Sequence, residues 1–312
     1  MNILVTGGAG FIASHIVNGY IEAGHHVTVI DNLSSGELRF LNPKAKFYEM
    51  DILDIKVPEV LKKEKINAIN HHAAQISVSD SVTDPVFDAN SNIIGTLQLI
   101  QNAVSLNVKK FIFASTGGAM YGEQIHFPAS EDHPCQPLSP YGISKLCAEN
   151  YLSFFNDQYG LSTTVLRYSN VFGPHQNPHG EAGVIAIFCQ KLVKSQKPVI
   201  CGDGEQTRDF ISVRDVVQAN LIALDPKCIG TFNVGTGKET SVNSLTECLL
   251  GISGKTISAI YGSARNGEQR RSVIDCKKFH ESFGWKPEVS LEQGLQWLTM
   301  IRMDTWILLF LL

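Results

Sequence analysis

A strand pattern runs directly into a glycine-rich turn and then into a helical pattern near the start of the chain. The apolar run ILVT occupies residues 3–6, glycines follow at positions 7, 8 and 10, and apolar residues then recur with helical spacing from Phe11 to Ala23. Backbone N–H groups at the start of a helix lie at the positive end of its dipole and bind phosphate, and glycines let the phosphate approach the backbone. The segment therefore predicts a strand–turn–helix unit that binds the pyrophosphate of a dinucleotide.

The glycine turn has the spacing Gly-x-x-Gly-x-x-Ala through Gly7, Gly10 and Ala13. Loops of this kind usually carry a third glycine for close packing of the helix on the sheet, so we expect Ala13 to strain that packing slightly without preventing binding. A second strand pattern, HHVTVID, ends at Asp31, about twenty residues beyond the loop. A carboxylate there bonds the adenosine ribose and repels a 2′-phosphate, which favours NAD over NADP. The alternative for Asp31 is a solvated carboxylate at a strand end.

Strand and helix patterns alternate along the first half of the chain. Further strand-like runs are AKFYEMD, INAINHH, KKFIFAS and TTVLRYS, and the longest helical stretches span residues 85–107 and 140–159. This alternation predicts an α/β fold with a doubly wound parallel sheet, the Rossmann fold. We expect residues 1–167 to form the NAD-binding domain, with a returning segment near 210–235. Residues 168–312 are expected to form a smaller, discontinuous α/β lobe that binds the substrate.

Charge and cysteine usage exclude other classes of function. The net charge is −4 and no basic run is present, which argues against a nucleic-acid partner. The seven cysteines include no C-x-x-C pair, so we expect free thiols, no metal site and a reducing compartment. No signal-peptide pattern precedes the first strand, which favours the cytoplasm. The apolar run from Trp306 to Leu312 is shorter than the about 20 residues that span a bilayer, so we expect no membrane span.

Tyr141 and Lys145 stand four residues apart in the segment SPYGISK. Ser139 and Pro140 predict a helix N-cap and first turn, and the spacing puts both side chains on one face of that helix. A phenol has a pKa near 10, so lowering it by roughly three units requires about 4 kcal/mol of differential stabilisation. A nearby ammonium and a nicotinamide cation can supply this together, which predicts proton transfer by Tyr141. The alternative is an ordinary surface pair, which the glycine loop upstream disfavours.

Several motifs, spread along nearly the whole chain, together resemble those of one protein family. The chain resembles the extended short-chain dehydrogenases/reductases, in the NAD-dependent epimerase/dehydratase group, and is most similar there to the UDP-glucose 4-epimerases. The matching motifs are TGGAGFIASH at 6–15, DNLSSG at 31–36, HHAAQ at 71–75, NIIGT at 92–96, STGGAMYG at 115–122, YGISK at 141–145, LRYSNVFGP at 166–174, GDGEQTRDFISVRDV at 202–216 and RNGEQRRS at 265–272.

The resemblance implies a role for each residue that matches these motifs. The residues expected to hold NAD are Gly7, Gly10, Phe11 and Ile12 at the pyrophosphate, Asp31, Asn32 and Ser35 at the adenosine ribose, Asp51 and Ile52 at the adenine, and Ala73, Gln75, Asn92 and Lys145 at the nicotinamide half. The residues expected to hold the sugar nucleotide are Gly117, Asn170, Arg208, Arg265 and Glu268. The implied reaction is inversion at C4 of a UDP-hexose through a 4-keto intermediate, with Tyr141 as the base.

The segment STGGAMYG departs from the family pattern. Many relatives carry a serine or threonine hydroxyl where this chain has Gly117, so Thr116, Ser115 or a water is expected to replace it. Related 4,6-dehydratases carry an Asp-Glu pair where this chain has Gly117 and Gly118, so dehydration is disfavoured. The remaining alternatives are a uronate 4-epimerase or decarboxylase, and a non-catalytic NAD-sensing protein, for which an activated tyrosine has no use.

Three further expectations follow from the resemblance. Ser272 stands where a bulky residue in some relatives excludes an N-acetyl group, so UDP-N-acetylglucosamine is an expected additional substrate. His72 replaces a usual apolar residue near the nicotinamide, and we expect local hydrogen bonds to satisfy it rather than a role in tuning the cofactor. The resemblance also implies a homodimer through the helices near 85–107 and 140–159, although their apolar residues are equally compatible with a core position.

Overall fold

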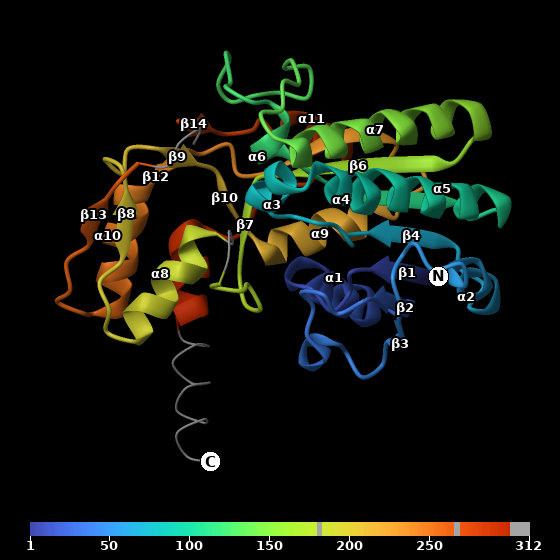
Figure 1. Ribbon diagram of the computed structural model, residues 1–312, viewed down its shortest axis with the longest axis horizontal. Coiled ribbons are helices and arrows are strands. Elements are labelled where there is room, and N and C mark those ends of the chain that lie inside the picture. The colour runs from blue at the N-terminus through green and yellow to red at the C-terminus, as the bar shows by residue number, and fades with distance from the viewer. Residues whose placement is uncertain (180–182, 265–268, 300–312) are drawn as a thin grey trace.

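A parallel sheet of seven strands forms the centre of the protein in a computed structural model that describes residues 1–179, 183–264 and 269–299 (Figure 1). The strand order is β11-β6-β5-β4-β1-β2-β3, and every neighbouring pair is parallel. The strands are β1 (Asn2–Thr6), β2 (His26–Asp31), β3 (Lys46–Glu49), β4 (Ala68–His71), β5 (Lys110–Thr116), β6 (Ser162–Tyr168) and β11 (Gly230–Val234). The predicted doubly wound α/β fold is confirmed.

Helices cover both faces of this sheet. One face carries α1 (Phe11–Glu22), α9 (Val213–Ala223) and α11 (Lys277–Phe283), and the other carries α2 (Val57–Lys63), α5 (Gly95–Ser105) and α7 (Pro140–Tyr159). Alternate residues of β1 enter the two cores: Ile3 and Val5 pack with α1, whereas Leu4 packs with α5. Because both sides of each central strand are covered, the strands read as continuous apolar runs.

The two predicted long helices are present. Helix α7 begins where Ser139 accepts a hydrogen bond from the Gly142 N–H, with Pro140 in its first turn. The stretch from 85 to 107 forms α4 (Pro85–Ala89), the π-helical turn η2 (Asn90–Ile94) and α5, after the short helix α3 (Val78–Thr83). A π turn widens a helix locally and often occurs at functional sites.

A smaller lobe lies at one end of the main sheet, on the left in Figure 1. Its elements are β7 (Asn170–Phe172), α8 (Val184–Val193), β8 (Val199–Cys201), β9 (Thr207–Arg208), β10 (Phe210–Ser212), β12 (Thr240–Ser241), α10 (Val242–Ser253), β13 (Ile260–Gly262), β14 (Arg271–Ser272) and helical residues 291–299. This lobe has its own core, to which Phe188, Leu245 and Leu295 contribute. Between the lobe's segments, α9 and β11 return to the main sheet.

The remaining short elements are η1 (Leu38–Phe40) and α6 (Gly117–Met120). All seven cysteines are free thiols. Among the residues that the structure describes, no helix combines the length and apolar character needed to cross a membrane. The apolar run from Trp306 to Leu312 lies outside the described residues.

Candidate active site

The glycine loop after β1 has a shape that only small residues permit. Gly7 has φ of +69°, and a Cβ placed on it would lie 2.8 Å from the backbone nitrogen of Ala73. Gly10 is the N-cap of α1 and provides no side chain to cap the helix. The first-turn N–H groups of α1, at Phe11 and Ile12, have no partner within the helix itself. The loop therefore offers a narrow cradle for an anion at a helix N-terminus.

Asp31 fixes this cradle from the end of β2. One carboxylate oxygen accepts a hydrogen bond from the Ala9 N–H at 2.9 Å and the other accepts from the Leu33 N–H at 2.8 Å. The sequence did not indicate this structural role. A carboxylate can accept about four hydrogen bonds, so Asp31 retains lone pairs for the two hydroxyls of a ribose.

The residues expected at the adenosine end lie close to Asp31. The Asn32 amide donates to Asp51 Oδ2 at 2.8 Å, which brings these two side chains together. Ile52 is buried and packs against Gly95, where an added Cβ would lie 2.6 Å from Ile52 Cδ1. Ser35 is exposed in the turn after β2.

The residues expected at the nicotinamide end are held by paired hydrogen bonds. The Gln75 N–H donates to Asn92 Oδ1 at 3.0 Å, and Asn92 Nδ2 donates to the Gln75 carbonyl at 2.9 Å. Asn92 lies in the π turn, where it also donates to Asp88 at 2.9 Å. Ala73 faces Gly7 across the ends of β1 and β4.

Asp88 is a fully buried carboxylate whose charge acts on both Tyr141 and Lys145, and sequence reasoning missed it. It accepts hydrogen bonds from Asn92 Nδ2, from Ser144 Oγ at 2.5 Å and from Gln75 Nε2 at 3.3 Å. Ser144 precedes Lys145 on α7, so Asp88 links α4 to the helix that carries Tyr141 and Lys145. The sequence did contain one indication of this contact: Asp88 and Asn92 are four residues apart, and side chains at that spacing are neighbours on a helix.

Tyr141 and Lys145 lie on one face of α7, as predicted. Lys145 Nζ is 6.0 Å from the centre of the Tyr141 ring and donates to the Ala114 carbonyl at 3.0 Å. Burial lowers the pKa of Lys145 to about 8, against the opposing effect of the Asp88 and Glu149 carboxylates. Burial, and secondly Asp88, raise the pKa of Tyr141 above its usual value. Deprotonation of this phenol therefore depends on the positive charges placed beside it.

The turn after β5 faces the start of α7. Thr116 caps α6 by accepting a hydrogen bond from the Ala119 N–H at 3.1 Å, which leaves its hydroxyl proton to donate. A Cβ placed on Gly142, next to Tyr141, would lie 3.0 Å from the Ala119 carbonyl oxygen, so this turn and the helix start are in contact. A Cβ on Gly118 would lie 3.8 Å from both Thr116 Oγ1 and Asn170 Oδ1. Thr116, Gly118 and Asn170 are thereby brought together.

Gly117 and Ser115, on either side of Thr116, contact the protein interior. A Cβ on Gly117 would lie 2.8 Å from Ile274 Cδ1 and 3.3 Å from the Tyr168 carbonyl oxygen, so this position faces packed interior. The Ser115 hydroxyl donates to Glu149 at 2.5 Å. Ser115 and Thr116 were the two residues expected to supply the hydroxyl that is missing at Gly117. Because the Ser115 hydroxyl already donates to Glu149, the geometry favours Thr116 as the source of that hydroxyl.

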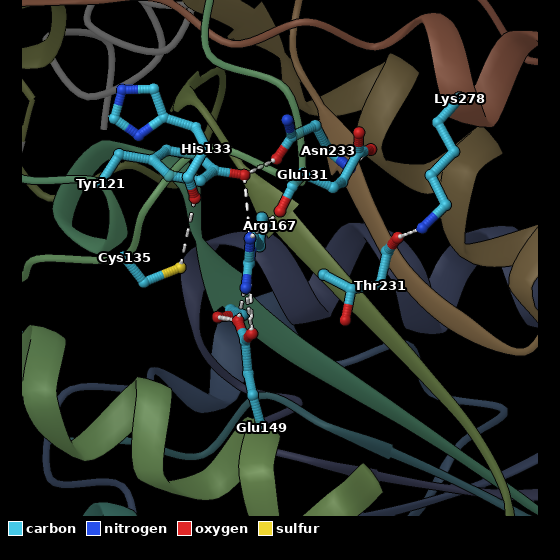
Figure 2. Close-up of polar contacts among 10 residues, drawn as sticks. Tyr121, Glu131, His133, Cys135, Glu149, Arg167, Thr231, Asn233 and Lys278 are labelled. Carbon is cyan, nitrogen blue, oxygen red and sulfur yellow. Dashed lines mark hydrogen bonds and ion pairs between the residues drawn. The ribbon is translucent and has the colours of Figure 1, made fainter. Parts of the chain in front are cut away.

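Glu149 belongs to a buried polar network, shown in Figure 2. Arg167 on β6 binds the Glu149 carboxylate through Nε at 3.1 Å and Nη2 at 2.6 Å, and donates through Nη1 to the Tyr121 hydroxyl at 3.0 Å. Tyr121 donates onward to Asn233 of β11 at 2.6 Å. Glu149 follows Lys145 by one helical turn, so the network fixes α7 against β5 and β6.

Part of the expected sugar-nucleotide site can be placed. Asn170 opens β7, and Arg208 ends β9, where its Nη1 donates to the Thr207 carbonyl at 2.8 Å. Ser272 on β14 pairs with Arg208 in parallel register and is buried. Arg265 and Glu268 lie outside the described residues.

These features fit a dinucleotide laid across the carboxyl ends of the parallel strands. The cradle at Gly7 and Gly10 would be closed by side chains, and Asp31 lies at the end of β2, on one side of β1. Lys145 and Asn92 lie on the other side of β1, where Lys145 bonds to Ala114 of β5 and Asn92 bonds to Gln75, shortly after β4. Ligands of open α/β sheets bind at this edge, where the strand order reverses.

Known proteins are similar to this chain in both sequence and fold. The model of the NAD dependent epimerase/dehydratase family matches residues 3–235. A putative UDP-glucose 4-epimerase from Methanocaldococcus jannaschii is 48% identical over 294 residues, 94% of this chain and 96% of the relative. The crystal structure of UDP-glucose 4-epimerase with UDP-glucose from Thermotoga maritima has a TM-score of 0.95 and 48% identity, and covers 98% of this chain and 100% of that chain. The UDP-glucose 4-epimerase from Thermus thermophilus in complex with NAD has a TM-score of 0.91 and 38% identity, with 97% and 99% coverage.

Proposed function

Because this chain belongs to the NAD-dependent epimerase/dehydratase family, we propose that it is an NAD-dependent isomerase that inverts C4 of a UDP-hexose, interconverting UDP-glucose and UDP-galactose. The observation that carries the proposal is the placement of Tyr141 and Lys145 on one face of α7, with Lys145 bonded to β5 of the same parallel sheet whose strand β1 leads into the glycine cradle. Relatives of nearly full coverage bear the name UDP-glucose 4-epimerase, which supports this choice among the family's reactions.

The cofactor of this family fits the cradle described above. We assign Gly7, Gly10, Phe11 and Ile12 to the pyrophosphate, Asp31, Asn32 and Ser35 to the adenosine ribose, Asp51 and Ile52 to the adenine, and Ala73, Gln75, Asn92 and Lys145 to the nicotinamide half. Bound NAD supplies the hydride acceptor, and then the donor, that a transient oxidation at C4 requires.

Tyr141 transfers the proton in this scheme. As phenolate it takes the proton of the sugar 4-hydroxyl, and it returns that proton when the keto group is reduced. Burial and Asp88 both oppose its ionisation, so the Lys145 ammonium and the cationic nicotinamide must offset them together. With a pKa of about 8, Lys145 is charged in most molecules at neutral pH.

The sugar must present both of its faces to the same reactive groups. Asn170 and Arg208, with Arg265 and Glu268, are proposed to hold the diphosphate while the keto sugar turns, and arginine suits this because its planar fork pairs with phosphate oxygens. We propose that the Thr116 hydroxyl bonds the sugar O4 and that the backbone N–H of Gly117 also contacts the substrate; the free hydroxyl proton of Thr116 supports the first assignment. Elimination of water needs a further acid and base, and Gly117 and Gly118 provide none.

The deciding experiment is incubation of the purified protein with UDP-glucose, followed by NMR detection of UDP-galactose without added NAD. Tyr141→Phe should reduce turnover by roughly 100- to 10,000-fold, the usual contribution of a positioned acid–base group, and should retain bound NAD. Asp157→Asn, an exposed change at the far end of the same helix, is the matched control and should leave turnover unchanged. Bound NAD without interconversion would redirect the proposal to UDP-uronates, acetylated UDP-sugars or NAD sensing.

We further propose a homodimer formed through α3, α4 and α7. These helices pack on one another and expose large apolar side chains that the main core does not cover, among them Val82, Val86, Phe87, Ile143 and Phe154. An exposed apolar surface of this kind marks an interaction site. Seven free thiols support a reducing compartment, and we propose the cytoplasm.

A further inference from the structure

The ammonium of Lys145 lies over the ring of Phe113, a residue to which neither the sequence motifs nor the proposed mechanism gives a role. Lys145 Nζ is 4.6 Å from the centre of the Phe113 ring, closer than its 6.0 Å from the centre of the Tyr141 ring. Phe113 is fully buried and Lys145 is 4% exposed. A cation above an aromatic ring is attracted to the negative face of the π system, and this attraction is stronger where water is excluded.

Strand β5 provides two contacts that replace water around this ammonium. Lys145 Nζ donates to the Ala114 carbonyl at 3.0 Å, which engages one of the three N–H donors of the ammonium. Phe113 precedes Ala114 on the same strand and belongs to the core between the sheet and α7, to which Phe111 and Ala148 also contribute. Close packing in this core holds the Phe113 ring beside the lysine.

Two carboxylates favour the charged form of Lys145, but both also have other partners. Asp88 on α4 accepts a hydrogen bond from Ser144 Oγ at 2.5 Å, and Glu149 on α7 is paired with Arg167 at 2.6 Å. Burial opposes the effect of these carboxylates and lowers the pKa of Lys145 to about 8. The two carboxylates therefore offset only part of the loss of water around the ammonium.

The other titratable groups that act on or with Lys145 bring no negative charge to it. His71 ends β4 and His72 follows it, and burial, with Lys145 as the second cause, lowers the pKa of each imidazole, so both rings are neutral. Tyr141 lies one helical turn before Lys145, and burial, with Asp88 as the second cause, raises the pKa of its phenol. A carboxylate near this site thus favours the ammonium but opposes ionisation of the phenol.

We propose that Phe113 is a positioning residue for the reaction: its ring face takes the place of water at the buried Lys145 ammonium and keeps that group charged beside Tyr141. A neutral ring stabilises the cation without adding the negative charge that makes Asp88 unfavourable for the phenolate. This inference rests on the proposed role of Lys145 in proton transfer, but the contact itself does not depend on which sugar is the substrate.

The first test follows the titration of Lys145 directly, by 13C NMR of the lysine Cε carbons with NAD in excess. The Lys145 signal is the one that disappears in Lys145→Arg. Phe113→Leu removes the ring and should lower the pKa of Lys145 by about one unit, the effect of losing a desolvated cation–π contact. Phe111→Leu is the matched control: Phe111 is equally buried in the same core and packs against His71 at 6.0 Å, so its loss should reduce stability and leave the pKa of Lys145 unchanged.

The second test keeps the size of the ring nearly constant and changes its charge distribution. Fluorine withdraws electron density from the face of the ring, so Phe113 is replaced by mono-, di- and trifluorinated phenylalanine in turn. The pKa of Lys145 should fall stepwise along this series, while the midpoint of thermal unfolding stays near that of wild type. The same series at Phe111 should leave the pKa of Lys145 in place. A constant pKa across the Phe113 series would overturn the inference, because packing alone would then explain any effect of Phe113→Leu.

Activity gives a separate readout. The reaction needs Lys145 protonated, so kcat/KM is lost as the pH rises through the pKa of this group, and fluorination of Phe113 should move that alkaline limb to lower pH by the amount that NMR shows. An alkaline limb that stays in place while the pKa moves would overturn the role of Phe113 in the reaction. Lys145 that titrates as expected in a protein without turnover of UDP-glucose would refute the proposed function and support the cation–π contact.

Discussion

Glu149 and Arg167 form an ion pair in the interior, with 2.6 Å between Oε2 and Nη2 and both side chains almost fully buried. Removing one partner of such a pair leaves a buried charge uncompensated. We expect Glu149→Gln to lower the free energy of unfolding by about 3–5 kcal/mol, measured by urea denaturation. The pair Arg270–Asp203 is also bidentate but exposed, so Asp203→Asn should cost less than about 1 kcal/mol. Equal losses in the two variants would contradict this account.

We expect Asp88 to influence the pH range of the proposed reaction. Its carboxylate raises the pKa values of both Tyr141 and Lys145. In Asp88→Asn both values fall, so Tyr141 ionises at lower pH and Lys145 also loses its proton at lower pH. Both limbs of the plot of kcat/KM against pH should move toward acid, whereas an unmoved profile with reduced stability would make Asp88 purely structural.

Positions 117 and 118 should respond differently to an added hydroxyl. Gly117→Ser forces a side chain against Ile274, and overpacking of this kind typically costs about 1–3 kcal/mol of stability. Ile274→Val in the same chain should recover part of that loss. Gly118→Ser meets only contacts of 3.8 Å and should be tolerated in thermal denaturation. A Gly117→Ser variant as stable as wild type would contradict this prediction and would show that the Ile274 side chain moves aside at little cost.

Ser272 bears on the choice of sugar. Because the residue is small, we expect the wild-type protein to act on UDP-N-acetylglucosamine as well as on UDP-glucose, in the NMR assay described above. Ser272→Tyr should reduce turnover of the acetylated sugar by more than tenfold and retain most turnover of UDP-glucose, since even one methylene group more or less in a binding pocket changes specificity by about 10- to 200-fold. If the wild-type protein turned over UDP-glucose but not UDP-N-acetylglucosamine, this prediction would be wrong.

The proposed dimer depends on apolar residues of α4 and α7. Charged replacements at Val86 or Phe154 place a carboxylate in that surface, so Val86→Asp and Phe154→Glu should shift the protein toward monomer in sedimentation velocity. Ile55 is 89% exposed and lies away from these helices, so Ile55→Asp is the matched control. A wild-type protein that sediments as a monomer would exclude the dimer.

Local sequence signals predicted the elements that build the site. The Ser139–Pro140 pair correctly indicated the start of α7, and the glycine spacing indicated the loop before α1, because caps and positive-φ turns depend on nearby residues. The roles assigned to individual site residues stay predictions.

Contacts between distant segments could not be read from local patterns. Asp88 accepts a hydrogen bond from Ser144, which lies on another helix. Gly117 packs against Ile274, which is more than 150 residues further along the chain. His72 Nε2 lies 3.2 Å from the hydroxyl of Tyr168 on β6, whereas its Nδ1 has no hydrogen-bond partner among the described residues, so the local hydrogen bonds that we expected satisfy only part of the ring. Burial and partner geometry of this kind arise only when the chain has folded.

The return of β11 to the main sheet beside β6 has a consequence for synthesis of the chain. A ribosome that has made residues 1–168 has produced six of the seven strands, and β6 then presents an open edge, which is prone to pairing with other chains. That edge is covered only when the chain has been made as far as Val234. Nascent chains stalled before this point should therefore be the ones that aggregate or recruit chaperones.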